Sequence, residues 1–205
     1  TPYRGISNDT AFVLKTTNGG NNWFKHYVYT QQFVGHNRIK FLNQNTGYTV
    51  GVTAFIGASS INKTTNGGLN WFMVPPPDPF FTVDDMSLFN EDTIWLAASS
   101  LSTGGVFRTT NGGANWQAQY QGNNPNRIYM YDKNLGFISP PTLGALYRTT
   151  NSGINWVQVP GTDGFNDVKF VDDLTGWKAN GFMRKTTNGG LNWVQQILPS
   201  GGQIS

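Results

Sequence analysis

The sequence of 205 residues contains no cysteine, two histidines and a single glutamate, Glu91. The lack of cysteine excludes a disulfide framework, a thiol nucleophile and a cysteine-based zinc site. His26 and His36 flank one short segment with no third ligand nearby, so we expect no transition-metal site. Asp84–Asp85 and Asp172–Asp173 lack the spaced, oxygen-rich loop of a calcium site, and we expect solvated acids there. We therefore expect neither a metal nor a cofactor.

Long apolar runs and a one-sided charge are also missing. No stretch approaches the ~20 apolar residues of a membrane helix, and no signal-peptide pattern is present. The net charge is +3, and the pI near 9.2 reflects few acids rather than a basic patch. No Lys/Arg run alternates with stacking aromatics, so we expect no nucleic-acid partner and no membrane insertion. The chain opens on Thr1 within a repeat, from which we expect a mature or excised piece of a longer precursor.

One eight-residue phrase is present five times. Its first copy is Thr16-Thr-Asn-Gly-Gly-Asn-Asn-Trp23, and the others end at Trp71, Trp116, Trp156 and Trp193, at spacings of 48, 45, 40 and 37 residues. Such periods are typical of propellers and other repeat arrays. Between the copies the chain is rich in Gly, Asn, Thr, Val and aromatic residues, which predicts short antiparallel strands rather than helices.

Each residue type of the phrase has a structural role. Asn-Gly and Gly-Gly supply the positive φ of a tight hairpin turn. The Thr hydroxyl and the Asn amide can bond turn backbone, and the Trp can fold over the hairpin and bury its ring. We therefore interpret the phrase as structural, with the following residues in these roles: Thr16, Asn18, Gly20, Trp23, Thr64, Asn66, Gly68, Trp71, Thr109, Asn111, Gly113, Trp116, Thr149, Asn151, Gly153, Trp156, Thr186, Asn188, Gly190 and Trp193.

One full repeat contains four predicted strands. It begins near Arg38, turns at 43–47, continues through Tyr48 and 61–65, and ends after the phrase at Trp71. Four antiparallel strands make one propeller blade, with the phrase as the hairpin between strands three and four. We predict an all-β, five-bladed β-propeller forming a single domain over 1–205, with repeats at 1–29, 30–74, 75–119, 120–159 and 160–198.

The phrase resembles the Asp-box, or BNR repeat, in a variant with Asn where Asp is usual. The wider pattern, as in 165–177 followed by 184–190, resembles the photosystem II stability and assembly factor-like propellers. Relatives of that group are modules of large secreted bacterial surface proteins, which implies a secreted or cell-surface bacterial module. In families with this box the phrase lies away from the ligand face, and likeness to assembly factors implies a protein partner.

The two ends of the chain complement each other on this repeat. Residues 199–205, through Gln203 and Ile204, start an inner strand without a blade of its own. The N-terminal segment supplies strands two to four of a blade that lacks its inner strand. We therefore expect one end to complete the other and close a five-bladed ring. The alternative is a piece of a longer array whose terminal strands stay unpaired.

A ligand site is expected where each outer strand leads into the next inner strand, because loops from every blade meet at the channel mouth. Aligning the inner strands puts Arg38, Asp85, Arg127, Asp167 and Gln203 at equivalent positions. Two interpretations stay open. The arginines pair with the aspartates of adjacent blades as scaffold, or these groups bind a polar or anionic ligand.

Aromatic residues are frequent in the loops of the same face. Tyr29, Phe81 and Phe165 are candidates to stack on a sugar or a peptide, and the phenylalanines are equally suited to fill gaps between blades. Phe33 and His36 are assigned to the first of these loops, and Tyr120 opens a later one. A different set, Tyr48, Trp95, Phe137 and Trp177, follows the inner turn at one equivalent position and is predicted to be core.

Enzymatic readings lack their residues. A sialidase needs three arginines and a Tyr activated by a Glu, and Glu91 falls on the opposite face by this alignment. A glycosidase pair of Asp85 and Asp167 would have each acid beside an Arg, which lowers the pKa needed for a general acid. We therefore predict a non-catalytic binding platform for a protein partner. The alternatives are a glycan-binding lectin and a structural repeat that self-associates or serves a multidomain parent protein.

Overall fold

The computed structural model describes residues 12–28, 33–53, 59–78, 81–99, 104–122, 124–140 and 144–197. These residues form β-strands and no helix, so no described helix has the length and apolarity to cross a membrane. The strands pair antiparallel into one two-stranded and four four-stranded sheets. The predicted all-β class with repeating four-stranded units is confirmed.

Within each sheet the strands follow one another in chain order. The sheets are β1 (Phe12–Lys15) and β2 (Phe24–Tyr27); β3 (Phe33–Phe41), β4 (Gly47–Thr53), β5 (Ser59–Thr64) and β6 (Phe72–Val74); β7 (Thr82–Leu88), β8 (Ile94–Ser99), β9 (Gly105–Thr109) and β10 (Gln117–Gln121); β11 (Arg127–Met130), β12 (Gly136–Ser139), β13 (Tyr147–Thr149) and β14 (Val157–Gln158); β15 (Asp167–Phe170), β16 (Gly176–Asn180), β17 (Phe182–Thr186) and β18 (Val194–Gln195).

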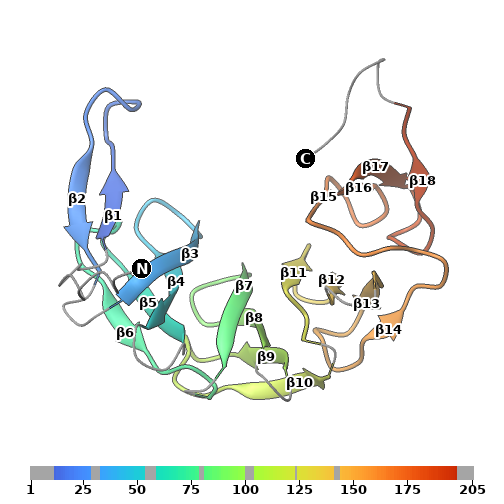
Figure 1. Cartoon of the computed structure of the whole chain (residues 1–205), viewed down its shortest axis with the longest axis horizontal. Coiled ribbons are helices and arrows are strands. Elements are labelled where there is room, and N and C mark those ends of the chain that lie inside the picture. The colour runs from blue at the N-terminus through green and yellow to red at the C-terminus, as the bar shows by residue number, and fades with distance from the viewer. Residues whose placement is uncertain are drawn as a thin grey trace, which may run out of the picture.

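The sheets stand side by side in an arc (Figure 1). The first strand of each four-stranded sheet, β3, β7, β11 and β15, lies on the concave side, and the fourth strand lies on the convex side. We call the end where an outer strand passes to the next inner strand the connection end. The opposite end carries the turns of the repeated phrase, which we call box turns, and is the box end.

The prediction of a closed five-bladed ring is wrong. Closure needs the last sheet to pack on the first as neighbours pack on each other, and these two sheets stand at opposite tips of an open arc (Figure 1). The first sheet contains two described strands, β1 and β2, which are strands three and four of its repeat. Residues 1–11 and 198–205, including the predicted closing strand at 199–205, lie outside the described residues.

Two predicted loop boundaries also need correction. Strand β3 begins at Phe33, so Phe33 and His36 belong to the strand rather than to the preceding loop. Its pairing with β4 shifts register between Phe33 and Gly35 and between His36 and Arg38. Such bulges let a strand continue past an irregular stretch that looks like a loop in sequence. Tyr120 likewise lies in β10, beside a register shift after Ala118.

A separate hydrophobic core fills each space between neighbouring four-stranded sheets. Strand β8 shows how one strand serves two cores. Ile94 and Leu96 face the sheet of β3–β6, whereas Trp95 and Ala97 face the sheet of β11–β14. Because successive side chains point to opposite faces, a sheet inside the arc needs apolar residues at every position.

The predicted core position after the inner turn is buried in three sheets. Tyr48, Trp95 and Phe137 are at most 1% exposed, whereas Trp177 is half-exposed. Trp177 lies in β16, on the last described sheet of the arc. The other three aromatics are covered by a following sheet, and no described sheet follows this one.

The box turns form the hydrogen bonds expected from their sequence. In the fourth turn the Thr149 hydroxyl accepts from the backbone N–H of Asn151 at 3.3 Å and of Gly153 at 3.0 Å, and donates to Asn151 Oδ1 at 3.0 Å. The same Oδ1 accepts from the N–H of Asn155 at 3.0 Å. These bonds recur in the other four turns. Each turn thus satisfies its own backbone without help from the rest of the chain.

The predicted burial of the box tryptophans holds in part. In each turn Cζ2 of the Trp lies 3.3 to 3.8 Å from where a β-carbon on the second glycine would stand, so the ring folds over its own turn. Trp71, Trp116, Trp156 and Trp193 are half-buried, whereas Trp23 is 57% exposed. Trp23 belongs to the first sheet of the arc, where no described sheet precedes it.

The buried box threonines are expected to stabilise the fold more than the first one. Thr149→Ala leaves two buried N–H groups without their acceptor, which should lower the free energy of unfolding by about 1–3 kcal/mol. Thr16→Ala should cost less, because water reaches that half-exposed turn. Urea unfolding measures both, with Thr150→Ala at an exposed neighbour as control. Equal losses for Thr149→Ala and Thr16→Ala would contradict this account.

Candidate functional site

Four charged residues lie at one register position on the inner strands. Arg38, Asp85, Arg127 and Asp167 pair with Val50, Ala97, Ser139 and Ala179 of their second strands, at the connection end. We call these four residues the inner-strand row. The equivalence inferred from the sequence therefore holds in the strand pairing, and the row spans the four full sheets.

Asp85 is held by three sheets at once. It is 6% exposed, and its Oδ1 accepts from Lys40 Nζ at 3.2 Å and from its neighbour Met86 N at 2.9 Å. Arg38 Nε lies 3.8 Å from the same oxygen, and Oδ2 accepts from Ile128 N at 3.1 Å. Asp85 thus joins the sheets of β3, β7 and β11, which is a scaffold role.

The other predicted pair does not form. Arg127 donates from Nε to the Asn166 carbonyl at 3.2 Å and from Nη1 to the Asn126 carbonyl at 2.8 Å. Among the described contacts it makes no ion pair with Asp167, whose Oδ1 accepts from the N–H of Val168 at 2.9 Å. Asp167 is exposed and Arg127 half-buried, so both present charge on the concave side. The row is therefore neutralised at Asp85 and open at Arg127 and Asp167.

Asp84 is a member of this region that the sequence argument placed among solvated acids. A register shift between Val83 and Asp85 makes it the extra residue of a bulge, and it is half-buried. Burial raises the pKa of its carboxyl; the Ser99 hydrogen bond and the charges of Arg127 and Arg38 act in the opposite direction. Its Oδ2 accepts no hydrogen bond from the described residues. A double aspartate on a strand that must pair at both neighbours is the signal for such a bulge.

The second aspartate pair behaves as expected for surface acids. Asp172 Oδ1 accepts from the N–H groups of Leu174 at 2.9 Å and Thr175 at 2.6 Å, which lowers the pKa of the Asp172 carboxyl. Both Asp172 and Asp173 are exposed. Within the described ranges no three His, Asp or Glu side chains gather as a metal site would require.

The candidate aromatics are mostly packed inside. Phe165 is 4% exposed and belongs to the core between the last two sheets. Phe81 is half-buried, with its ring centroid 5.1 Å from that of Phe107. Tyr29 and Gln203 lie outside the described residues. Of the predicted loop aromatics, those the structure describes fill gaps between sheets.

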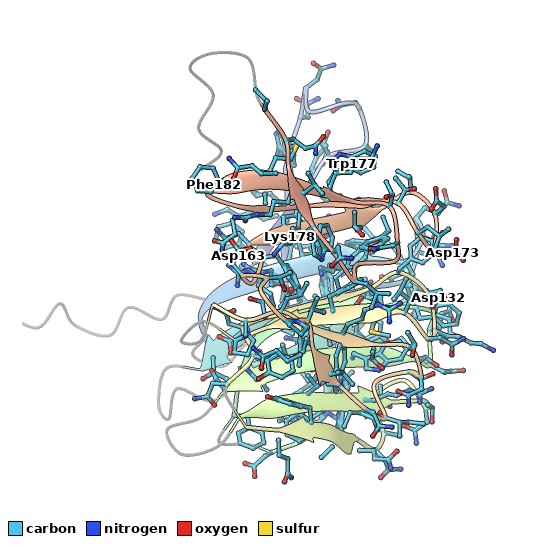
Figure 2. All side chains as sticks on the ribbon, turned by 90° about the vertical axis from the view of Figure 1, so that its right-hand side faces the viewer. Asp132, Asp163, Asp173, Trp177, Lys178 and Phe182 are labelled. Atoms are coloured by element: carbon cyan, nitrogen blue, oxygen red, sulfur yellow. The ribbon has the colours of Figure 1, made fainter. Side chains whose placement is uncertain are left out.

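A buried lysine near the row was not anticipated. Lys178 has a side chain with 0% exposure, and its Nζ donates to Asp163 Oδ1 at 2.8 Å, to the Asp163 carbonyl and to the Gly164 carbonyl at 3.2 Å. Arg184 Nη1 lies 2.6 Å from Asp163 Oδ2. Figure 2 shows Lys178 next to Asp163, which belongs to the connection that leads into β15. The cluster therefore ties this connection to its sheet.

The repeat itself contains the signal for this lysine. The residue after the core aromatic is Thr49, Leu96, Ile138 and Lys178 in the four full sheets. Every one of these side chains is buried. A cation where other copies have an apolar residue or threonine requires a buried counter-charge, and Asp163 is the nearest acid in the preceding connection.

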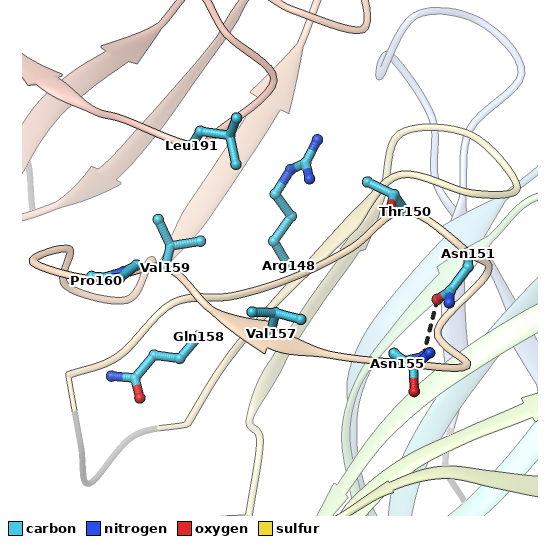
Figure 3. Close-up of a pocket in the computed structure, with 9 residues that line it drawn as sticks. All are labelled: Arg148, Thr150, Asn151, Asn155, Val157, Gln158, Val159, Pro160 and Leu191. Carbon is cyan, nitrogen blue, oxygen red and sulfur yellow. Dashed lines mark hydrogen bonds between the residues drawn. The ribbon is translucent and has the colours of Figure 1, made fainter.

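A hollow of about 560 Å³ opens at the convex side between the last two sheets (Figure 3). Val157 of β14, Pro160 and Leu191 supply apolar walls, and Arg148 of β13 lies at its centre. Burial lowers the pKa of the Arg148 guanidinium, whose Nε donates to the Gly189 carbonyl at 2.6 Å. This arginine holds the next box turn, so we interpret the hollow as a gap beside a structural contact.

Comparison with known proteins shows the fold. No family model matches the chain, and a search of curated protein sequences also finds no match. Among solved structures, YCF48 bound to D1 peptide aligns over 82% of this chain and 55% of its own, with 17% identity and a TM-score of 0.57. YCF48 from Cyanidioschyzon merolae aligns over 86% and 60%, with 20% identity and a TM-score of 0.61. The GH74 enzyme of Niastella koreensis aligns over 95% and 38%, with 15% identity and a TM-score of 0.69.

The chain thus spans between about two fifths and three fifths of the length of these three structures. At such low identity the likeness concerns the fold alone. Together with the row of antiparallel four-stranded sheets it shows an all-β fold of the β-propeller type, present here as an open arc.

The Lys178–Asp163 pair is expected to behave as a coupled unit. Asp163→Ala leaves the Lys178 cation buried without its carboxylate and should lower the free energy of unfolding by about 3–5 kcal/mol. Lys178→Leu, which copies Leu96 of another sheet, should be close to neutral. In the double variant most of the Asp163→Ala loss should vanish. Urea unfolding of the four proteins gives the coupling energy, and additive losses would contradict the pairing.

The same pair predicts an acid-sensitive step. Burial tends to raise the pKa of Asp163, but the hydrogen bonds and charges of Lys178 and Arg184 outweigh it and lower that pKa below the usual 3.8. An acid with a lowered folded-state pKa stabilises the fold above its unfolded pKa, and this is lost as the pH falls through the folded value. Unfolding free energy followed from about pH 5 to pH 2 should fall more steeply for the wild type than for Asp163→Ala/Lys178→Leu. Parallel curves would contradict this assignment.

Proposed function

We propose that this chain is a non-catalytic binding module that holds a carboxylate-bearing peptide segment of a protein partner along the inner-strand row. The observation that carries the proposal is the unequal exposure of charge there. The acid Asp85 is turned inward and already bonded, whereas the side chains of Arg38 and Lys40 are 37% and 39% exposed. Arginine forks bind carboxylates with two parallel hydrogen bonds, so Arg38 and Arg127 are the groups we expect to contact the ligand.

The shape of the site favours an extended ligand. The row crosses four sheets of an open arc, and its members come from four different inner strands. A peptide laid across these strands would meet cations first and Asp167 last, which gives it a preferred direction. One of the fold relatives is YCF48 bound to D1 peptide, so a peptide site on a fold of this type has a precedent. This likeness supports a protein partner over a glycan.

A hydrolase is the less favoured reading, although GH74 enzymes share the fold type. Glycoside hydrolysis uses two carboxyl groups across the bond, one of them protonated. Both oxygens of Asp85 accept hydrogen bonds within the scaffold, which leaves no lone carboxylate there for a water or a sugar. Asp84 is the remaining acid of the region, and its raised pKa makes Asp84→Asn the variant that would reveal hidden hydrolysis.

We further propose that the box turns are an Asn variant of the Asp-box, and that the module works on the outside of a bacterial cell. The five turns share one hydrogen-bond pattern in which the Asn oxygen takes the place that an Asp oxygen could fill. The lack of cysteine makes the fold independent of the redox state of its surroundings. Fractionation of the producing cells tests the location directly.

Binding should depend on the two arginines of the row. We would probe an array of acidic, basic and neutral peptides beside a glycan array, using the wild type and Arg38→Ala/Arg127→Ala. Acidic peptides should bind the wild type, and the double variant should lose about ten- to a hundredfold in affinity, because hydrogen bonds to charged groups are involved. Lys25→Ala/Lys133→Ala removes the same charge at exposed positions and serves as control.

The outcomes separate the candidate functions. Peptide binding that the control retains and the double arginine variant loses supports the proposal. Glycan binding with the same dependence would replace it with a lectin at the same row. Binding that is insensitive to Arg38 and Arg127, or no binding by folded protein, would remove the row as the site.

A further inference from the structure

Each full sheet carries a row of three paired residues near its box end, one from each of its first three strands. The pairings Lys40–Tyr48 and Tyr48–Lys63 define this row in the sheet of β3–β6, and we call such a set a cross-sheet row. The remaining rows are Ser87–Trp95–Arg108, Tyr129–Phe137–Arg148 and Lys169–Trp177–Lys185. The middle residue is always aromatic and the third is always Lys or Arg.

The first members of these rows bond the inner strand of the next sheet. Lys40 Nζ donates to the Met86 carbonyl of β7. Ser87 Oγ accepts from the N–H of Met130 in β11 at 2.9 Å. The Tyr129 hydroxyl accepts from the N–H of Phe170 in β15 at 3.1 Å. Three different side chains thus make the same connection from one sheet to the next.

The middle members contact the turns at the box end of the next sheet. The Tyr48 hydroxyl donates to the Glu91 carbonyl at 3.0 Å, and Trp95 Nε1 donates to the Ser152 carbonyl at 3.0 Å. Phe137 lies so near Gly190 that a β-carbon there would stand 2.4 Å from its ring. The second box glycine therefore leaves room for the aromatic of the preceding sheet.

The third members donate to the same turns. Arg148 Nε bonds the Gly189 carbonyl at 2.6 Å, and Lys15, the corresponding residue of the first sheet, bonds the Gly67 carbonyl at 2.7 Å. Lys63 Nζ donates to the Glu91 carbonyl at 3.4 Å. The cation before each box threonine is therefore a bridge to the next box turn.

The last row has no such partner in the described part of the chain. Lys185 lies over its own Trp177 ring at 5.2 Å, and Lys169 is exposed. Trp177 is half-exposed where its three counterparts are at most 1% exposed. This face has the complete set of groups that joins sheets elsewhere in the arc, and no described sheet meets it.

The first box turn has the opposite vacancy. A β-carbon on Gly19 would meet no atom within 4 Å, and one on Gly20 would meet only Trp23 at 3.8 Å. At the corresponding glycines of the other turns, Lys15, Trp95, Arg148 and Phe137 of preceding sheets stand close. Trp23 is 57% exposed. The turn thus offers the same backbone carbonyls and the same glycine gap, uncovered.

We propose that two copies of this chain associate head to tail, with the Lys169–Trp177–Lys185 row of one copy on the first box turn of the other. By the pattern inside the arc, Lys185 donates to the Gly19 carbonyl and the Trp177 ring covers Gly20. The partner is a second copy because the two faces of one chain stand at opposite tips of the arc (Figure 1). Unlike faces meet, so the contact repeats into a larger ring or a filament.

Sedimentation equilibrium over a wide range of protein concentration tests the proposal. The mass of the wild type should rise from one chain toward larger assemblies. Lys185→Ala should weaken association by about ten- to a hundredfold, because a hydrogen bond from a cation is lost. Lys133→Ala, at an exposed lysine far from either face, should not.

Gly20→Asn tests the opposite face. Asn tolerates positive φ better than other side chains, and its bulk should exclude Trp177 of the partner. Gly144→Asn places the same residue at another positive-φ glycine with open space and is the matched control. Circular dichroism and urea unfolding verify that each variant keeps its fold.

A mixing experiment decides the geometry. A Trp177→Ala/Lys185→Ala chain keeps its first box turn, and a Gly20→Asn chain keeps its last row. Each alone should stay at the mass of one chain, and their mixture should reach the mass of two chains and no more. A wild type that stays at one chain at all concentrations, or a mixture that does not associate, would overturn the proposal.

Discussion

The whole arc depends on the contact between a cross-sheet row and the box turn of the next sheet. A four-stranded sheet has two faces, and at the box end the turn exposes backbone carbonyls that its own side chains do not satisfy. A lysine or arginine of the preceding sheet bonds these carbonyls, as Arg148 does at Gly189, while an aromatic fills the space above the glycine. Because every sheet carries both halves, sheets add one after another without a central core.

This arrangement also explains why the arc has ligand-ready edges. The box end is occupied by structural contacts, so its charges and carbonyls are largely engaged with each other. At the connection end the inner strands meet through Asp85, which binds three sheets with one carboxylate. The cations around it are then neither buried nor fully compensated. Binding capacity therefore arises on the concave side as a by-product of how the strands are joined.

The repeat period, the strand order and the box-turn hydrogen bonds could be predicted from the sequence, since each depends on residues close together in the chain. The equivalence of Arg38, Asp85, Arg127 and Asp167 could be predicted too, because one repeat aligns with the next. The open arc could not. Ring closure depends on the angle between neighbouring sheets, which results from the packing of many side chains, and no single motif encodes it. The bulges in β3 and β7 were missed for the same reason, since pairing on both sides decides them.

In a repeat protein the informative positions are those where one copy departs from the others while staying buried. Lys178 occupies a place that holds leucine or isoleucine in two other sheets, and it persists only because Asp163 and two carbonyls of the connection surround it. Asp84 is a second departure, an acid inserted by a bulge between Arg38 and Arg127. Neither is needed for strand pairing, and each costs desolvation that an apolar residue would avoid. Both lie at the connection end, beside the row that we propose as the binding site, where a fixed charge pattern has a use that packing alone does not require.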